Sequence, residues 1–94
     1  MIVYKITYPN GKIYVGKDET DTLTYFGSVD SNLVAADFTE TERDNFSITK
    51  ETLWRSVTGN KIELAEMEKN HILRLKSNDP DIGYNRWPKF ARVK

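Results

Sequence analysis

The pattern of apolar and polar positions predicts a β-hairpin at the start of the chain. Met1 to Tyr8 is rich in β-branched and aromatic residues, and Lys12 to Gly16 alternates apolar with polar side chains. Asn10-Gly11 lies between the two runs, and both residues accept the positive φ that a tight turn requires. We therefore predict two antiparallel strands, the second of which ends by Lys17.

This hairpin would bring two tyrosines, Tyr4 and Tyr14, close together. Cross-strand aromatic pairs stabilise sheets by about 0.2–1 kcal/mol without any chemistry. The pair therefore fits a purely structural role as well as a functional one.

The next part of the chain predicts a loop, two short segments and a third strand. Asp18 to Thr24 is polar and acidic, which favours a loop. Asn32 to Phe38 predicts a short helix capped by Ser31 or Asn32, and Thr39 to Asn45 a helical turn or a loop. Phe46 to Val57 alternates at its start and contains several threonines, which predicts a strand that has room for a bulge.

The most regular helical pattern runs from Lys61 to Lys76. Asn60 stands at the N-cap position, with Glu63 three residues later, and Asp79-Pro80 ends the helix. At about 100° per residue, one apolar stripe forms along this helix, from Leu64, Ala65, Ile72 and Leu75. Beyond the helix, Ile82 to Asn85 predicts a turn that leads into a short extended piece.

Glu68 lies inside this apolar stripe, four residues from both Leu64 and Ile72. A carboxylate on an inward face is costly unless it is paired, hydrogen-bonded or bound to a metal. Glu68 is therefore a candidate functional residue. The alternative is that it lies at the rim of the stripe and pairs with Lys61 or Arg55.

Composition narrows the class of protein. The 94 residues predict one domain over residues 1–94, and the absence of cysteine excludes disulfides and thiolate metal sites. No apolar run approaches the roughly 20 residues that span a bilayer, so we expect a soluble intracellular protein. Formal net charge is zero, but residues 18–44 hold eight acids against Arg43, while residues 69–94 hold seven bases against two acids.

The basic residues from about Arg86 onward form a C-terminal tail that suits contact with phosphates, although a merely solvated tail fits equally well. The acidic segment would repel DNA. It is therefore expected to face away from DNA or to bind something else.

Several short blocks, taken together, resemble the GIY-YIG nuclease family over most of the chain. They are Ile2-Val3-Tyr4, Tyr14-Val15-Gly16, Tyr25-Phe26-Gly27-Ser28, Asn45-Phe46, Glu68 and Gly83-Tyr84-Asn85. The resemblance implies an α+β fold, with a three-stranded antiparallel sheet flanked by helices. It also implies hydrolysis of DNA phosphodiesters with one divalent metal ion, Mg²⁺ or Mn²⁺.

The resemblance assigns roles to four residues of this chain. Glu68 would be the metal ligand, Tyr4 the general base, Tyr14 its hydrogen-bonding neighbour, and Asn85 a brace for the site. A phenol is a poor base at a pKa near 10, so the metal cation or a nearby lysine would have to lower the pKa of Tyr4. The nearby candidates are Lys5, Lys12 and Lys17.

Two positions depart from the family pattern. Ile2 replaces the glycine of the first motif, and the arginine that normally follows the second motif is missing, since Lys17 is the only base from Lys17 to Glu42. Arg43 or Arg55 would have to reach the site instead. The options are a slow nuclease, a relocated arginine, or a domain that has lost catalysis.

DNA is the partner that the resemblance implies, with contacts from a set of basic residues: Lys12, Lys17, Arg86, Lys89 and Arg92. The first alternative is a catalytically inactive nucleic-acid-binding module on the same fold. The second is a protein-interaction domain that uses the acidic segment 18–44. By analogy, the protein would act in the cytoplasm of a bacterial or phage-infected cell and stem from a phage or mobile element, with self-association or a protein partner supplying specificity.

Overall fold

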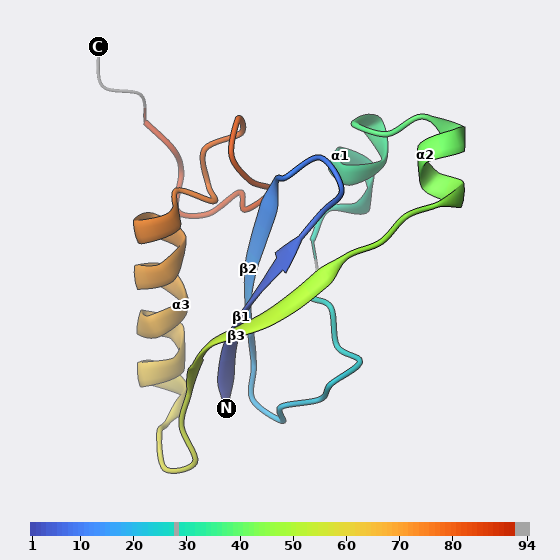
Figure 1. Ribbon diagram of the computed structural model, residues 1–94. Helices are drawn as coiled ribbons and strands as arrows, with labels where there is room; N and C mark the ends of the chain where they lie inside the picture. The colour runs from blue at the N-terminus through green and yellow to red at the C-terminus, as the bar shows by residue number, and fades with distance from the viewer. Residues whose placement is uncertain (28, 92–94) are drawn as a thin grey trace.

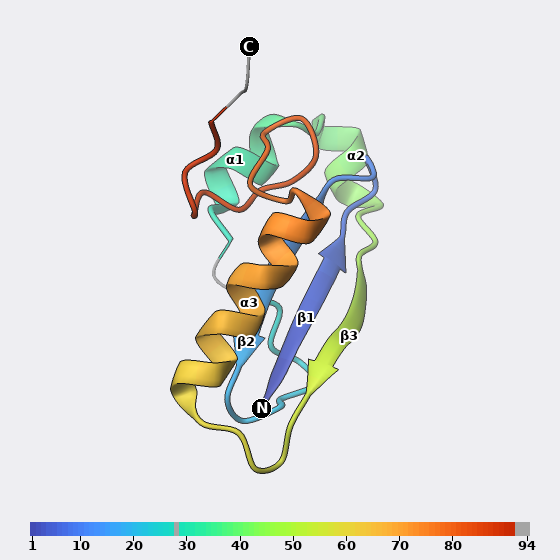
Figure 2. The same cartoon turned by 90° about the vertical axis from the view of Figure 1, so that its left-hand side faces the viewer.

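The computed structural model describes residues 1–27 and 29–91. Its elements are β1 (Ile2–Thr7), β2 (Ile13–Asp18), α1 (Ser31–Ala36), α2 (Glu40–Asp44), β3 (Thr49–Arg55) and α3 (Lys61–Leu75). The strands form one antiparallel sheet in the order β2-β1-β3. Helix α3 lies on one face of the sheet, while α1 and α2 lie on the other side (Figures 1 and 2). The predicted α+β class, with three antiparallel strands flanked by helices, is confirmed.

The central strand β1 is apolar throughout because it feeds two cores. Successive side chains of a strand point to opposite faces. Ile2, Tyr4 and Ile6 belong to one buried cluster, which also contains Tyr8, Phe38 and Tyr84. Val3 points the other way and packs with Val15 of β2 and with Leu64 and Ile72 of α3. The sheet therefore carries a core on each face.

The predicted hairpin is confirmed, with β2 running to Asp18 rather than ending by Lys17, and both tyrosines lie beside Gly27 as neighbours. Gly11 has a φ of 84°, which suits the turn between β1 and β2. Tyr4 stands opposite Gly16, and Tyr14 stands opposite Ile6. The tyrosines are therefore diagonal neighbours on one face of the sheet rather than a directly opposed pair. The pairing of β1 with β3 contains a register shift, which agrees with the bulge predicted for the third strand.

The helix boundaries follow their caps. The N-cap of α1 is Asp30, so the prediction of Ser31 or Asn32 was wrong, because the Asp30 carboxylate accepts hydrogen bonds from two N–H groups of the first turn. A capping box between Thr39 and Glu42 makes the next segment a helix, α2. Asn60 caps α3 as predicted, and Lys76 in the left-handed conformation ends it. The third strand is shorter than predicted, at Thr49–Arg55.

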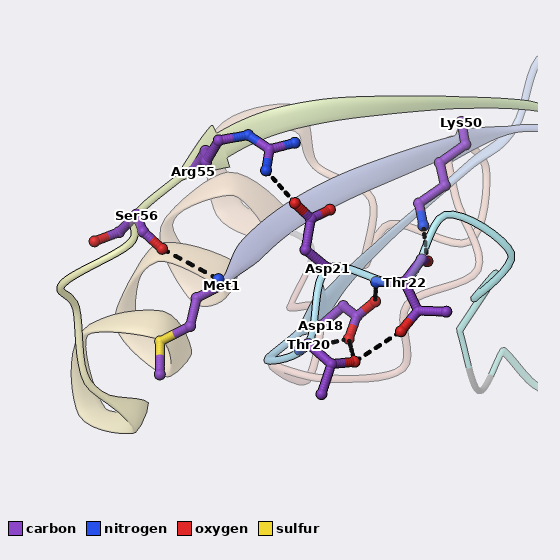
Figure 3. A network of polar contacts seen from close by, with 8 residues as sticks. All are labelled: Met1, Asp18, Thr20, Asp21, Thr22, Lys50, Arg55 and Ser56. Carbon is purple, nitrogen blue, oxygen red and sulfur yellow. Dashed lines mark hydrogen bonds and ion pairs between the residues drawn. The ribbon is translucent and has the colours of Figure 1, made fainter.

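A network of polar contacts ties the loop after β2 to the sheet (Figure 3). The Asp18 carboxylate accepts hydrogen bonds from Thr20 and Thr22, which fold the loop back on itself. Lys50 of β3 donates to the carbonyl oxygens of residues 22, 23 and 25, at 3.1, 3.4 and 2.7 Å. Arg55 forms an ion pair with Asp21. The loop is therefore held across the face of the sheet that contains Tyr4.

None of the helices formed by residues 1–27 and 29–91 is long and apolar enough to cross a membrane.

Candidate active site

The candidate site is a cavity of about 460 Å³ where β2, α3 and the C-terminal segment meet. Its lining includes Tyr14, Asp30, Glu68, Asn85, Arg86 and Trp87. Three of the four residues to which the family resemblance gave roles therefore face one space, although 71 positions separate Tyr14 from Asn85 in sequence. The fold brings carboxylate, amide, phenol and guanidinium groups to the same cavity.

The segment from Ile82 to Asn85 closes this side of the sheet by docking on the outer edge of β2. The backbone N–H of Ile13 donates to the carbonyl of Ile82 at 3.1 Å, and the N–H of Tyr84 donates to the carbonyl of Ile13 at 2.9 Å. At the next residue pair, the Asn85 side chain rather than the backbone forms hydrogen bonds with β2. Its Oδ1 accepts from the Val15 N–H and its Nδ2 donates to the Val15 carbonyl, both at 2.8 Å. Asn85 thus satisfies the backbone N–H and carbonyl of an edge-strand residue, which would otherwise lack these partners.

Tyr84 anchors the same segment to the hairpin turn. Its hydroxyl donates to Asp37 at 2.7 Å and accepts from Asn10 at 2.9 Å. Burial, followed by the hydrogen bond to the Asp37 carboxylate, raises the pKa of Tyr84 to about 12. The phenol therefore keeps its proton at neutral pH and can donate this hydrogen bond.

Replacing Asn85 by alanine is expected to lower the free energy of unfolding by about 2 kcal/mol, because two partly buried backbone groups of Val15 lose their partners. Urea denaturation measures the change. Asn70→Ala, at an exposed position of α3, is the matched control and is expected to have little effect. Equal stability of the two variants would contradict the bracing role.

Glu68 reaches the cavity from the helix face that packs on the sheet. Leu64 and Ile72, one turn before and after it, are buried against Val3 and Val15. Glu68 itself is half-buried, and burial raises the pKa of its carboxyl, while the charge of Lys17 opposes that rise. No group within residues 1–27 and 29–91 donates a hydrogen bond to this carboxylate.

The two ion pairs considered for Glu68 do not form. Lys61 lies 3.8 Å from Glu19, and Arg55 pairs with Asp21. Glu68 is thus a half-buried carboxylate that lines open space without an ion pair from Lys61 or Arg55.

Tyr4 lies behind the cavity wall and is completely buried. Its hydroxyl is held between Gly16 and Gly27, where a Cβ atom on either glycine would collide with it. Burial comes first among the causes that raise the pKa of Tyr4 well above its usual range, followed by the phenols of Tyr14 and Tyr25. Each of the causes raises this pKa, and none of them is a lysine.

The lysines that were expected to act on Tyr4 have other neighbours. Lys5 pairs with Glu51 at 3.1 Å, and Lys12 pairs with Asp37 at 3.0 Å. Lys50 instead lies 4.8 Å from the centre of the Tyr4 ring. An ammonium over the ring face is a cation–π contact, and it helps to keep the ring in place.

The arginines are distributed differently from the sequence expectation. Arg43 donates to the carbonyls of Ala35 and Phe38, and Arg55 pairs with Asp21, so neither lines the cavity. Arg86, predicted only as part of a basic tail, lines it instead. The Arg86 Nη1 lies 3.0 Å from Asp30, the residue that also caps α1, and 72% of its side chain is exposed. The sequence signal was its position directly after Gly83-Tyr84-Asn85.

The remaining predicted DNA contacts are spread over the surface. Lys17 acts on Glu68 at the cavity, while Lys12 is engaged by Asp37. Lys89 lines a second hollow, which it shares with Arg86 and Phe90. Arg92 lies outside the described residues.

Most of the acidic segment serves the fold. Six of its eight acids are engaged within the chain, by capping, by hydrogen bonds or by ion pairs: Asp18, Glu19, Asp21, Asp30, Asp37 and Glu42. Internal pairing thus accounts for much of the charge that suggested a protein-binding face.

A divalent ion at this cavity would have few protein ligands. No three histidine, cysteine or acidic side chains gather as a metal-binding group in the described part of the chain. Glu68 faces the cavity with a carboxylate to which none of the described residues donates a hydrogen bond. Mg²⁺ usually keeps several waters and binds through one or two carboxylates together with substrate phosphates, so this single carboxylate fits such an ion.

Comparisons of the chain with protein-family models, with curated proteins and with solved structures gave no match.

Proposed function

We propose that this chain is a GIY-YIG-type, metal-dependent endonuclease that hydrolyses DNA phosphodiester bonds at the cavity beside β2. The observation that carries the proposal is that Glu68 and Arg86 line the same cavity. Hydrolysis of an anionic phosphodiester is favoured by a side chain that binds a metal ion and by a positively charged side chain that contacts the phosphate directly. The carboxylate of Glu68 supplies the first, and the guanidinium of Arg86 supplies the second.

Glu68 would hold one Mg²⁺ or Mn²⁺ ion. Such an ion stabilises negative charge on the phosphate and on the leaving oxygen. Half-burial of Glu68 and its raised pKa favour the proposal, because a cation relieves the cost of a desolvated carboxylate.

Arg86 would bind the non-bridging phosphate oxygens. A guanidinium carries five N–H donors in a planar fork that matches phosphate geometry. Asp30 forms an ion pair with Nη1 and holds the Arg86 side chain at the rim of the cavity. The exposure of the Arg86 side chain lets a phosphate approach it. Arg86 would therefore take the role of the family arginine that is missing after the second motif.

Tyr14, rather than Tyr4, would contact the attacking water, because Tyr14 lines the cavity and Tyr4 is buried behind it. Tyr4 keeps its proton at neutral pH and supports the wall as a packing residue. The family's base role for Tyr4 therefore does not transfer simply to this chain.

The test is incubation of supercoiled plasmid with the protein and Mg²⁺ or Mn²⁺. Arg86→Ala is expected to reduce the nicking rate by about a hundredfold, the effect of losing one group that stabilises developing charge. Arg43→Ala is the matched control. Because Arg43 bonds only to carbonyls near α1 and α2 in the described chain, its loss is expected to leave the rate per folded molecule unchanged. Nicking that survives both Arg86→Ala and chelation of the metal would overturn the proposal.

The inactive nucleic-acid-binding module is the second candidate, and the burial and raised pKa of Tyr4 favour it. It predicts binding that weakens steeply with salt and no turnover with either metal.

A further inference from the structure

An exposed indole stands beside the candidate site. Trp87 follows Arg86, 59% of it is exposed, and it lines the Glu68 cavity. It also lines another cavity, of about 390 Å³, which runs along α3 and is distinct from the hollow beside Lys89. Lys61, Ile62 and Lys69 line this α3 cavity as well. An exposed indole offers a flat apolar face with a polar edge, which suits stacking against a planar ligand group.

Basic side chains lie near this indole, although Asp30, Glu66 and Glu68 also line the cavities that it shares. The ammonium of Lys69 lies 5.9 Å from the centre of the Trp87 ring, and Arg86 precedes it in the chain. Lys89, two residues later, lines the adjoining hollow. Aromatic faces flanked by cations bind single-stranded nucleic acid, since the bases stack on the ring while the cations contact the backbone.

The backbone around Trp87 is fixed on both sides. Asn85 is held by two hydrogen bonds to Val15 of β2. Asn78, which is buried, donates to the carbonyl of Pro88 at 2.6 Å. These anchors hold the Trp87 backbone in place before a ligand arrives, which lowers the entropy lost on binding.

We propose that Trp87 stacks on one unpaired base of single-stranded DNA, while Arg86 contacts a neighbouring phosphate of the same strand. In a duplex both faces of a base are covered by its neighbours, so the indole selects an unpaired nucleotide. This part of the inference rests on the proposed nuclease function: the preferred substrate class would be DNA with an unpaired nucleotide beside the cleaved bond. The stacking itself requires no cleavage.

The test measures binding without divalent metal. Fluorescence anisotropy of a labelled short oligothymidylate and of a labelled blunt-ended duplex of two separate strands gives the two affinities. Trp87→Ala is expected to weaken oligothymidylate binding by about tenfold and to leave duplex binding nearly unchanged. Ile62→Ala, an exposed apolar residue on the same α3 cavity, is the control and is expected to change neither affinity.

A second measurement follows the indole directly. In the Trp54→Phe background Trp87 is the only tryptophan, and oligothymidylate is expected to quench its fluorescence. Unchanged oligothymidylate affinity in Trp87→Ala, equal losses for both DNA forms, or no binding of oligothymidylate by the wild type would each overturn the stacking inference.

Plasmid nicking separates the two proposals. If Glu68-dependent nicking occurs while Trp87→Ala binds oligothymidylate normally, only the stacking inference fails. If Trp87 stacks on the oligonucleotide and no metal supports nicking, the stacking stands and the nuclease function fails.

Discussion

Glu68→Gln is expected to reduce metal-dependent plasmid nicking by about a thousandfold or more, because the amide removes the charge that would hold the ion. The rate of conversion of supercoiled to open-circular plasmid measures this loss. Glu66→Gln, an exposed glutamate on the same helix, is the matched control and is expected to nick like the wild type. A Glu68→Gln protein that nicks at a comparable rate would remove Glu68 from the mechanism.

The same substitution has a predicted pH signature in stability. Burial raises the pKa of Glu68 above its unfolded value, so the native state binds this proton more tightly than the unfolded chain does. The stabilising effect of that proton is present below the unfolded pKa and is lost as pH rises through the folded pKa. Relative to the wild type, Glu68→Gln is therefore expected to gain stability between acidic and neutral pH. Loss of activity with a retained fold would then separate chemistry from folding.

Gly16→Ala is expected to lower the free energy of unfolding by about 3 kcal/mol, the upper range for forcing an extra methyl group into a packed core. The new Cβ would collide with the hydroxyl end of Tyr4. That ring has no room to move, because it is completely buried and Gly27 closes the other side of the hydroxyl. Chemical denaturation, with the urea midpoint and slope, gives the change.

Gly11→Ala separates crowding from backbone strain. Gly11 has a φ of 84°, but no other atom lies within 4 Å of the position that a Cβ would take. Only the cost of the left-handed backbone is expected there, about 1 kcal/mol. If Gly16→Ala costs no more than Gly11→Ala, the tight contact between Tyr4 and Gly16 does not constrain this part of the fold.

Local patterns were enough to predict the hairpin and α3. Asn10-Gly11 dictates a tight turn, and Asn60 begins a helix whose apolar stripe packs on the sheet. The inward position of Glu68 also follows from helical periodicity, since about 3.6 residues per turn place it between two buried side chains.

Long-range pairing determined what the sequence could not predict. Arg86 looks like one base of a charged tail, and only the docking of Ile82 to Asn85 on β2 carries it into the cavity. Lys50 lies in an ordinary alternating strand, and its role appears only when its carbonyl partners fold back from residues 22 to 25. Neither position breaks a local rule, and the one sequence signal for Arg86 was its place directly after Gly83-Tyr84-Asn85.

The docking of the C-terminal segment on β2 also bears on the order in which parts of the chain are expected to fold. Val15 and Asn85 are 70 residues apart, so their contact closes one of the longest loops in the molecule, whereas β1 and β2 join through a short turn. Local contacts form first because they lose less chain entropy. During synthesis the hairpin therefore emerges with the outer edge of β2 still open to pairing with other chains. Because Asn85 lines the cavity, we expect the cavity to form late in folding.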